Sequence, residues 1–395
     1  MQFSSAHRQL KKTTLKVIED HVHPYIEDWE KEQMFPAHKV MKQFANAGLL
    51  GITKPKRYGG LGLDFSHEIV FSETLGSMRS SGIGTAIGVQ TSMATPALLK
   101  YGSEELKQAY LVPTIAGDMI ACIGVSESQA GSDVARIKTR AHLDGGDYVI
   151  NGQKMWITNG VQGDWICLLC NTSAENGPIR NKSIIIVPLK AKGVSVSRKL
   201  DKLTLRCSDT AELFFDNVRV PAGNLVGEAG MGFIYQMKQF QEERMFVTAR
   251  AIRAMEMAIE YTVEYTGKRH AFGRSIRSNQ AVYHKLSAMQ AEIEAARALL
   301  YHAVEVYSAG EDVTRLASMA KFLVGRMAMA VPGDCLQFWG GQGLLNDNWI
   351  SRAWRDIRQT AIGGGANEIM LEVIAKTMGI HPGSSVPAID KNGRI

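Results

Sequence analysis

The spacing of hydrophobic and polar residues divides the chain into three stretches. Residues 1–118 have the three- and four-residue hydrophobic steps that are typical of helices. Ser103 precedes two glutamates and is predicted to cap a helix, because its hydroxyl can accept a hydrogen bond from the first turn. Another helix is predicted over residues 12–29, where such steps link Leu15, Ile18, Val22 and Ile26. This stretch is expected to form an N-terminal helical domain.

From residue 119 to residue 222 the pattern changes to short runs of β-branched and apolar residues. The segment Asp144–Asp147 contains two glycines between such runs and predicts a hairpin turn. Strands are predicted over residues 120–125, 148–150, 165–170, 183–187 and 212–215. Short strands in close succession predict a small β-barrel or sandwich domain.

Long helical patterns return in residues 223–381. The longest predicted helices span residues 235–268 and 281–308, and with shorter helices they predict a four-helix-bundle-like C-terminal domain. Residues 382–395 lack periodicity and predict a frayed tail. The expected fold is therefore α+β and multidomain, in the order helical, β, helical.

Composition excludes several classes of protein. The 395 residues are 45% hydrophobic and 21% charged, which is ordinary for a globular chain and not for a disordered or fibrous one. No apolar run is long enough to predict a transmembrane helix, and no apolar run follows Lys11 and Lys12 as in a secretory signal. The net charge of +6 fits a solvated surface, and it also fits an anionic ligand or nucleic acid.

The five cysteines do not form the dense pattern of a disulfide scaffold, which favours a reducing compartment. Cys167 and Cys170 form the one CxxC, within a predicted strand, where residues three apart point to opposite faces. A zinc or redox role is therefore not expected, and the sequence predicts no metal site.

Two segments of the predicted β domain could bind a flat polar ligand. Val125–Asp133 follows a strand and is rich in small residues whose amides and hydroxyls could face a ligand, although it also reads as a plain loop. It does not match the dinucleotide or P-loop fingerprints. Trp156 and Thr158 would share one face of an extended chain and present an indole beside a hydroxyl. The alternative is a tryptophan buried in the β core.

Glu243 is the candidate general base. Phe240, Glu243 and Val247 are spaced three and four apart, so this carboxylate falls on the apolar stripe of the predicted helix. Partial desolvation there would raise its proton affinity, as a base requires. The alternative is a buried salt bridge to Arg244. Glu242 lies about 100° around the helix and is expected to face solvent or a partner.

Three further segments could contact a phosphate or another part of a ligand that lies close to the backbone. Arg269 follows a helix and could pair with a phosphate, although a basic residue is common at a helix C-terminus. Gln337–Gly343 is glycine-rich and allows close backbone approach. Ile362–Glu368 places three glycines before a helix, where free amides can bind an oxyanion, and it could also be a plain hinge.

Taken in order, these segments resemble the acyl-CoA dehydrogenase family. The resemblance extends from about residue 5 to residue 380, and six segments in register carry it. They are Val125–Asp133, Tyr148–Gly160, Arg206–Thr210, Arg269–Gly273, Gln337–Gly341 and Gly363–Met370. The resemblance implies bound FAD, an acyl-CoA substrate and a homotetramer or dimer of dimers.

The resemblance also implies roles for individual residues. Ala366 stands where the family usually has threonine, so one hydroxyl contact to the cofactor is missing. The implied FAD contacts are Val125, Ser126, Gly131, Ser132, Trp156, Ile157, Thr158, Arg269, Phe272, Gln280, Gln337, Gly340, Gly341, Ala366, Asn367 and Glu368. The implied substrate contacts are Ser132, Gln241, Arg244 and Gly365. Arg269, Phe272, Gln280, Gln337 and Gly341 would reach the FAD of a neighbouring subunit.

The family pattern also bears on the base. Many members carry the catalytic glutamate in the loop before the last helix, where this chain has Gly364. A subgroup that includes isovaleryl- and long-chain acyl-CoA dehydrogenases carries it on the long helix, at the position of Glu243. The resemblance therefore implies that Glu243 removes the α-proton, while the Gly364 amide bonds the thioester carbonyl and stabilises the developing enolate. The product would be a trans-2-enoyl-CoA.

The same resemblance implies electron transfer to an electron-transfer flavoprotein in a bacterial cytoplasm or the mitochondrial matrix. We expect neither a nucleic acid partner nor a membrane span. Two alternatives stay open: an oxidase of the same fold that passes electrons to oxygen, and a non-catalytic flavoprotein that binds nucleic acid. The sequence does not indicate the length or branching of the acyl chain.

Overall fold

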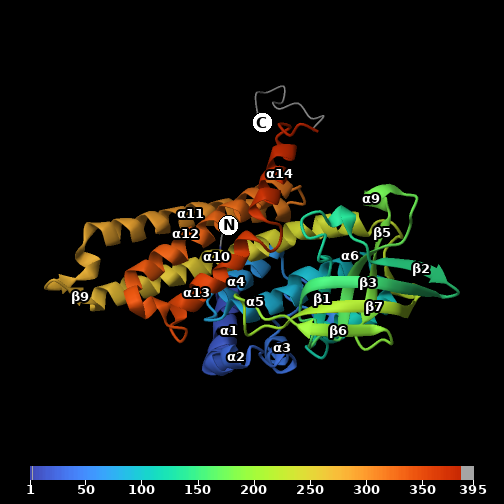
Figure 1. Cartoon of the computed structure of the whole chain (residues 1–395), viewed down its shortest axis with the longest axis horizontal. Coiled ribbons are helices and arrows are strands. Elements are labelled where there is room, and N and C mark those ends of the chain that lie inside the picture. Colours follow the sequence, from blue (N-terminus) through green and yellow to red (C-terminus); the bar gives the residue numbers. More distant parts are fainter. Residues whose placement is uncertain (2, 384–395) are drawn as a thin grey trace. The chain divides into compact units, whose positions relative to one another are not determined.

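The structure is a computed structural model that describes residue 1 and residues 3–383 (Figure 1). Contact density divides the chain into two compact units. We call residues 12–67 and 82–243 the β-containing unit, and residues 1–11, 68–81 and 244–395 the helical unit. The predicted frayed tail lies outside the described residues from residue 384 onward.

The strands of the β-containing unit form one mixed sheet in the order β6-β7-β3-β2-β4-β5-β8, with β1 pairing parallel to β4. The longest pair, β3 and β7, lies side by side in Figure 1. The strands are β1 (Ala121–Gly124), β2 (Arg140–Asp144), β3 (Asp147–Thr158), β4 (Trp165–Asn171), β5 (Lys182–Pro188), β6 (Val194–Lys199), β7 (Thr210–Pro221) and β8 (Leu225–Val226). All five predicted strands are confirmed, as is the hairpin turn between β2 and β3.

Several short helices accompany this sheet. They are α2 (Ile26–Glu32), α3 (Ala37–Asn46), α5 (Ser81–Gly88), α6 (Thr95–Tyr101), α7 (Glu104–Leu106), α8 (Val112–Ile115) and α9 (Gly177–Arg180), together with most of α1 (Ser5–His21). A π-helical turn, Val89–Ala94, joins α5 to α6. Ser103 caps α7 as predicted, because its hydroxyl accepts a hydrogen bond from the Leu106 amide at 3.2 Å.

The single helix predicted over residues 12–29 is wrong. Helix α1 ends at His21, a 3₁₀ turn follows at His23–Tyr25, and α2 begins at Ile26. Pro24 lies within that turn. Because proline has no N–H and its ring clashes with the preceding turn, it ends a helix whose hydrophobic spacing continues past it.

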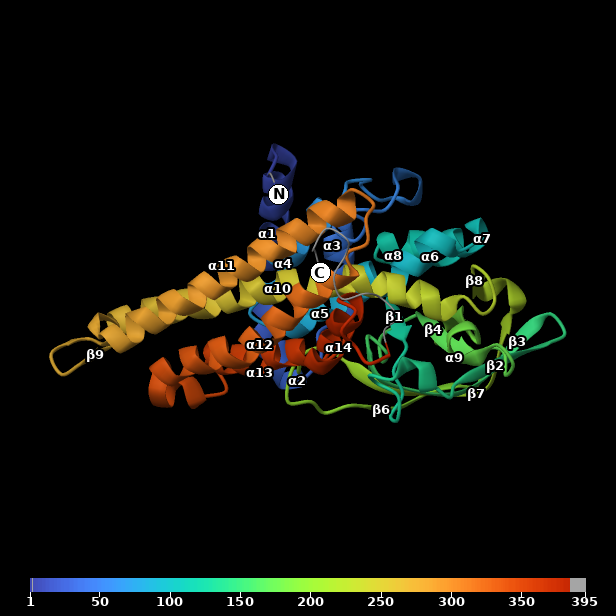
Figure 2. The ribbon, with the colours of Figure 1, turned by 90° about the horizontal axis from the view of Figure 1, so that it is seen from above.

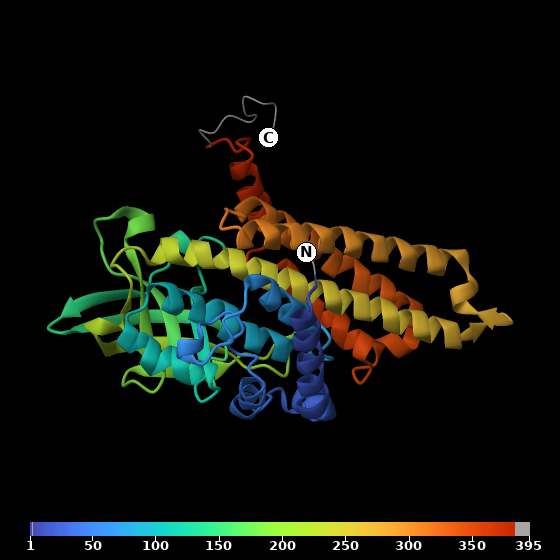
Figure 3. The same cartoon turned by 180° about the vertical axis from the view of Figure 1, so that it is seen from behind.

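Three long helices dominate the helical unit. Helix α10 (Gly232–Lys268) begins in the β-containing unit and continues without a break, as Figure 3 shows from behind. Within the helical unit it runs beside α11 (Gln280–Ser308), as seen from above in Figure 2, and α12 (Thr314–Trp339) packs against α11. The other elements are most of α4 (Phe65–Leu75), α13 (Trp349–Ile357), α14 (Asn367–Thr377) and the β9–β10 hairpin (His270–Ala271 and Arg274–Ser275).

Side-chain contacts hold these helices together. Arg297 on α11 forms ion pairs with Glu73 on α4 and Glu256 on α10, both at 3.1 Å. Lys285 on α11 pairs with Asp334 on α12 at 2.9 Å. These pairs connect neighbouring helices of the predicted bundle.

The boundaries after residues 118 and 222 remain predictions. Among the described residues, every helix is too short or too polar to span a membrane.

The cysteines lie in the interior, and their burial predicts that the native protein reacts poorly with thiol reagents. Cys167 and Cys170 are buried in β4, and burial raises the pKa of each thiol to about 12. Since the thiolate is the reactive form, we expect less than one equivalent of reaction with a disulfide reagent at pH 8 for the folded chain. The unfolded chain should react at all five cysteines. Rapid native modification of Cys167 or Cys170 would contradict this expectation.

Candidate functional site

A β-bulge in β3 turns Trp156 out of the sheet. The β3–β7 register shifts between Lys154 and Ile157, and Trp156 has a left-handed φ of 62°. Bulges of this kind re-aim side chains next to functional sites. The Trp156 side chain is consequently 55% exposed, so the interpretation of a tryptophan buried in the β core is wrong for this residue. Trp165, on β4, is the one that is fully buried.

The loop after β1 is fastened to this bulge. The Met155 amide donates a hydrogen bond to the Ser126 carbonyl at 3.0 Å, and Gln153 Nε2 lies 3.1 Å from Ser128 Oγ. A Cβ placed on Gly131 would lie 3.9 Å from the Trp156 ring. The two segments that the sequence singled out in the β domain are therefore brought together.

A buried ion pair joins the loop after β1 to the bulged strand β3. Lys154 Nζ lies 3.0 Å from Glu127 Oε1 and 2.8 Å from the Val125 carbonyl oxygen. The Glu127 carboxylate also accepts hydrogen bonds from the amides of Lys138 and Thr139, at 2.6 and 2.9 Å. Both side chains are buried. One carboxylate and one ammonium thus tie the start of the loop, its end and the bulged strand to each other.

The charges of this pair shift its titration. Burial acts to raise the pKa of Glu127, but the nearby Lys154 ammonium and the hydrogen bonds from Thr139 and Lys138 outweigh it and hold the pKa below its ordinary value. The ionised carboxylate is therefore the stable form in the folded protein.

The segments that this pair joins carry an exposed aromatic side chain and several hydroxyl groups. Trp156 offers an exposed aromatic face, and the hydroxyls of Ser126 and Thr158 lie on partly exposed residues near it in the chain. Gly131 and Ser132 are exposed in the loop. The Ile157 and Val125 side chains are buried, so their available ligand contacts are through the main chain. An exposed aromatic face, hydroxyls and free backbone groups are the kinds of group that bind a flat polar ring.

The first half of α10 carries two adjacent buried glutamates. Glu243 is 8% exposed, as its position on the apolar stripe predicted. Glu242 is also 8% exposed, so of the two alternatives expected for it, solvent or a partner, the structure supports a partner. Its Oε1 lies 2.5 Å from Lys100 Nζ on α6. This tertiary contact draws Glu242 inward, and helical periodicity alone could not reveal it.

The residues that follow on α10 belong to the helical unit. Arg244 is buried, and its Nη1 lies 3.2 Å from Ser318 Oγ on α12. Gln241, three residues before Arg244 and in the β-containing unit, is partly exposed.

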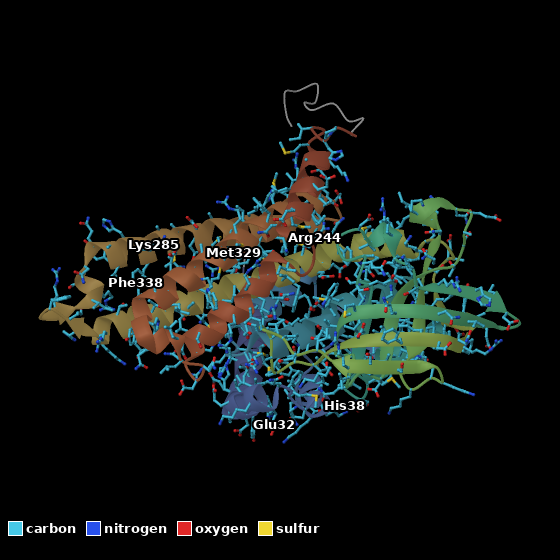
Figure 4. The ribbon with its side chains drawn as sticks, viewed as in Figure 1. Glu32, His38, Arg244, Lys285, Met329 and Phe338 are labelled. Atoms are coloured by element: carbon cyan, nitrogen blue, oxygen red, sulfur yellow. The ribbon has the colours of Figure 1, made fainter. Side chains whose placement is uncertain are left out.

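One end of the helical unit gathers six of the predicted cofactor residues. Phe272, at the tip of the β9–β10 hairpin, has a φ of 53° and is fully exposed. The stacked rings of Tyr265 and Trp339, 4.0 Å apart, join the end of α10 to the end of α12. Figure 4 labels Lys285 and Phe338 near this end. The six predicted cofactor residues that are exposed at this end are Arg269, Phe272, Gln280, Gln337, Gly340 and Gly341.

The glycine loop before α14 has a left-handed backbone. Gly364 and Gly365 have φ values of 68° and 97°, which explains why glycines stand there. The fully buried Lys321 on α12 donates a hydrogen bond to the Gly365 carbonyl. Ala366 is the N-cap of α14 and makes no side-chain cap bond, as expected where threonine is replaced. Asn367 and the exposed Glu368 form the first turn.

Sequence reasoning missed the residues that brace these loops. Glu127, Lys154 and Lys321 are charged residues that lie in the interior. A charged residue is usually exposed, and no local pattern distinguishes these three. Only the partners supplied by distant segments show why they are buried.

The Lys154–Glu127 pair predicts a large loss of stability when its cation is removed. We expect Lys154→Met to lower the free energy of unfolding by about 3–5 kcal/mol, because it leaves a buried carboxylate without its cation. Urea denaturation measures this. Arg219→Met, which removes an exposed pair with Asp144 on the same hairpin, is the matched control and should have a much smaller effect. Equal losses in the two variants would show that burial of the first pair is unimportant.

The lowered pKa of Glu127 predicts an acid-dependent contribution. Because the folded-state pKa lies below the ordinary value of 4.5, the stabilisation is fully present above about pH 4.5 and is lost as the pH falls through the folded pKa. The advantage of the wild type over Glu127→Gln in free energy of unfolding should therefore shrink below this pH. A difference that stays constant from pH 7 to pH 3 would contradict the assigned direction.

Comparisons with known proteins agree with this arrangement. Family models match the N-terminal domain of acyl-CoA dehydrogenase at residues 4–118, the middle domain at 122–218 and the C-terminal domain at 230–379. The chain is 35% identical over 376 residues to the mitochondrial long-chain specific acyl-CoA dehydrogenase of Sus scrofa, covering 95% of this chain and 86% of that protein.

Solved structures give the same result. An acyl-CoA dehydrogenase from Geobacillus kaustophilus has a TM-score of 0.91 at 36% identity, covering 95% of this chain and 98% of that one. A glutaryl-CoA dehydrogenase from Mycobacterium smegmatis, in complex with FADH2, has a TM-score of 0.89 at 28% identity and covers 95% of both chains. The chain belongs to the acyl-CoA dehydrogenase family of flavoprotein oxidoreductases, with a helical N-terminal domain, a β middle domain and a helical C-terminal domain.

Proposed function

We propose that this chain binds FAD and converts an acyl-CoA thioester to the trans-2-enoyl-CoA, with Glu243 removing the α-proton. The observation that carries the proposal is the burial of the Glu243 carboxylate on the long helix, in a family whose members place a glutamate there or in the loop before the last helix. This chain has Gly364 in that loop, so α10 supplies the carboxylate.

Different residues of the chain bind the cofactor and accept the proton. Trp156, Ser126 and Thr158 hold the flat ring of the cofactor against the bulged edge of β3, and Lys154 with Glu127 fixes that edge. When bound, FAD supplies the acceptor for the β-hydride. Low exposure of Glu243 keeps bulk water away from the carboxylate that accepts the α-proton.

Other residues bind and polarise the substrate. The Gly364 amide donates a hydrogen bond to the thioester carbonyl and stabilises the enolate oxygen, a role that requires no side chain. Ser132, Gln241, Arg244 and Gly365 contact the acyl-CoA. The left-handed backbone at Gly364, held through Lys321, fixes the direction of its amide before substrate arrives.

Assembly supplies the remaining contacts in this proposal. The chain forms a homotetramer, or dimer of dimers, in which Arg269, Phe272, Gln280, Gln337 and Gly341 contact the FAD of a neighbouring subunit. The full exposure of Phe272 supports this, because an aromatic side chain projecting from a hairpin tip buries its apolar surface only against another molecule. Ala366, Asn367 and Glu368 contact the adenosine part.

The two electrons removed from the substrate pass to an electron-transfer flavoprotein, in a bacterial cytoplasm or the mitochondrial matrix. These two points rest on family membership.

Replacement of Glu243 tests the proposal. We expect Glu243→Gln to retain FAD, shown by its visible spectrum, and to slow flavin bleaching by acyl-CoA at least ~100-fold, which is what a positioned base contributes. Anaerobic stopped-flow absorbance measures the rate.

Glu242→Gln is the matched control, since the two glutamates are adjacent and equally buried. It should retain most of the rate, because its carboxylate pairs with Lys100. Unchanged bleaching in Glu243→Gln, or an equal loss in both variants, would remove Glu243 from the reaction.

A further inference from the structure

The backbone explains two of the three glycines before α14, but not Gly363. Gly364 and Gly365 have left-handed φ values, whereas the φ of Gly363 lies outside that region and does not require glycine. A Cβ on Gly363 would instead lie 1.8 Å from Gln359 Nε2 and 2.9 Å from Gln359 Cδ. The Gln359 carboxamide therefore occupies the space into which a side chain at position 363 would project.

Main-chain hydrogen bonds bring Gln359 next to Gly363. Gln359 lies in a 3₁₀ turn, Arg358–Ala361, that packs against α12. Its carbonyl oxygen accepts hydrogen bonds from the amides of Ile362 and Gly363, both at 2.9 Å. The partly exposed carboxamide itself forms no hydrogen bond with any of residues 3–383. The side chain thus fills space beside the glycine loop without adding a bond to the fold.

The space that Gln359 fills adjoins the thioester site of the proposed function. The amide assigned there to the thioester carbonyl belongs to Gly364, the residue bonded to Gly363. Standard bond lengths then place Gln359 Nε2 within roughly 6 Å of the Gly364 nitrogen. The carbons closest to the thioester are the α- and β-carbons of the acyl group, so they are the part of the substrate that comes nearest to this carboxamide.

We propose that Gln359 is a specificity-determining residue that closes the space beside Gly363, and that the substrate is an acyl-CoA without a branch at its α- or β-carbon. The inference rests on the proposed function and goes beyond it by naming the substrate class. A straight chain leaves the carboxamide where it lies, whereas a branch directed at Gly363 requires the space that the carboxamide fills.

Both packing and solvation oppose such a branch. A methyl group at the position of a Cβ on Gly363 would overlap Gln359 Nε2, from which that position is only 1.8 Å away. A methyl group that packed against the carboxamide would take water from a polar group and return no hydrogen bond. Removal of the carboxamide should therefore admit branched acyl groups.

Anaerobic flavin reduction by hexanoyl-CoA, 2-methylhexanoyl-CoA and 3-methylhexanoyl-CoA tests the inference. We expect the wild type to favour hexanoyl-CoA over the branched substrates by ~10-fold or more in kcat/KM, which is the effect of one carbon in a closed site. In Gln359→Ala the preference over at least one branched substrate should largely disappear, because the carboxamide no longer fills the space.

A second substitution refills the space. The Cβ of Gly363→Ala would lie 1.8 Å from the wild-type position of Gln359 Nε2, so the double variant Gln359→Ala/Gly363→Ala returns an atom to nearly the same point. It should regain much of the preference for hexanoyl-CoA. A general loosening of the loop by Gln359→Ala would not be reversed in this way.

Binding without turnover gives an independent measurement. In the Glu243→Gln background, titration calorimetry of the FAD-loaded protein with the same three thioesters should show the same changes of preference in Kd. Gln359→Ala should change the Tm little, because no hydrogen bond is lost with the carboxamide. If the alanine variant does not fold, Gln359→Ser serves in its place.

Gln290→Ala on α11 is the matched control. Gln290 is also partly exposed, but its Nε2 donates a hydrogen bond to Glu294 Oε1 at 3.0 Å on the same helix. This variant should keep the wild-type preference.

The outcomes separate this inference from the proposed function. If acyl-CoAs reduce the wild-type flavin but the wild type does not favour hexanoyl-CoA, or its preference is the same in Gln359→Ala, the inference is overturned. If no acyl-CoA reduces the flavin, the proposed function itself fails.

Discussion

The cost of burying a polar or charged group without a partner governs this structure. The Lys154–Glu127 pair meets that cost with a salt bridge and three backbone contacts, and the result is a rigid junction between the loop after β1 and the bulge of β3. Lys100 does the same for Glu242, and Gln239 satisfies the backbone at the π-helical turn. These contacts hold in place the loops that the proposed function assigns to the cofactor and substrate.

This constraint separates groups that hold the fold from groups that act. Lys154, Glu127 and Gln239 have their hydrogen-bonding atoms directed at the chain itself. Trp156 and Phe272, in contrast, expose large apolar side chains from strained left-handed backbones, which is an arrangement that favours a ligand or a neighbouring subunit. Gln359 places its carboxamide over Gly363 and forms no hydrogen bond there with the described part of the chain.

Hydrophobic periodicity predicted the long helices α10 and α11 and all the strands named from it, because each element buries a regular face. It did not suffice where a local rule or a distant partner intervened. Pro24 ended a helix whose apolar spacing continued, the bulge turned Trp156 outward, and Lys100 drew Glu242 inside. The position of Glu243 could be predicted, since it depends on helical spacing alone. The braces Lys154 and Lys321 could not, because their partners come from other segments.

The central claim, that Glu243 removes the α-proton, is tested most directly by hydrogen exchange at the α-carbon. With the cofactor reduced beforehand, hydride transfer is blocked, and any loss of α-hydrogen to ²H₂O reports proton removal alone. NMR of bound acyl-CoA should show this exchange in the wild type, and exchange slower by a factor of ~100 or more in Glu243→Gln. Exchange at the wild-type rate in the variant would contradict the account.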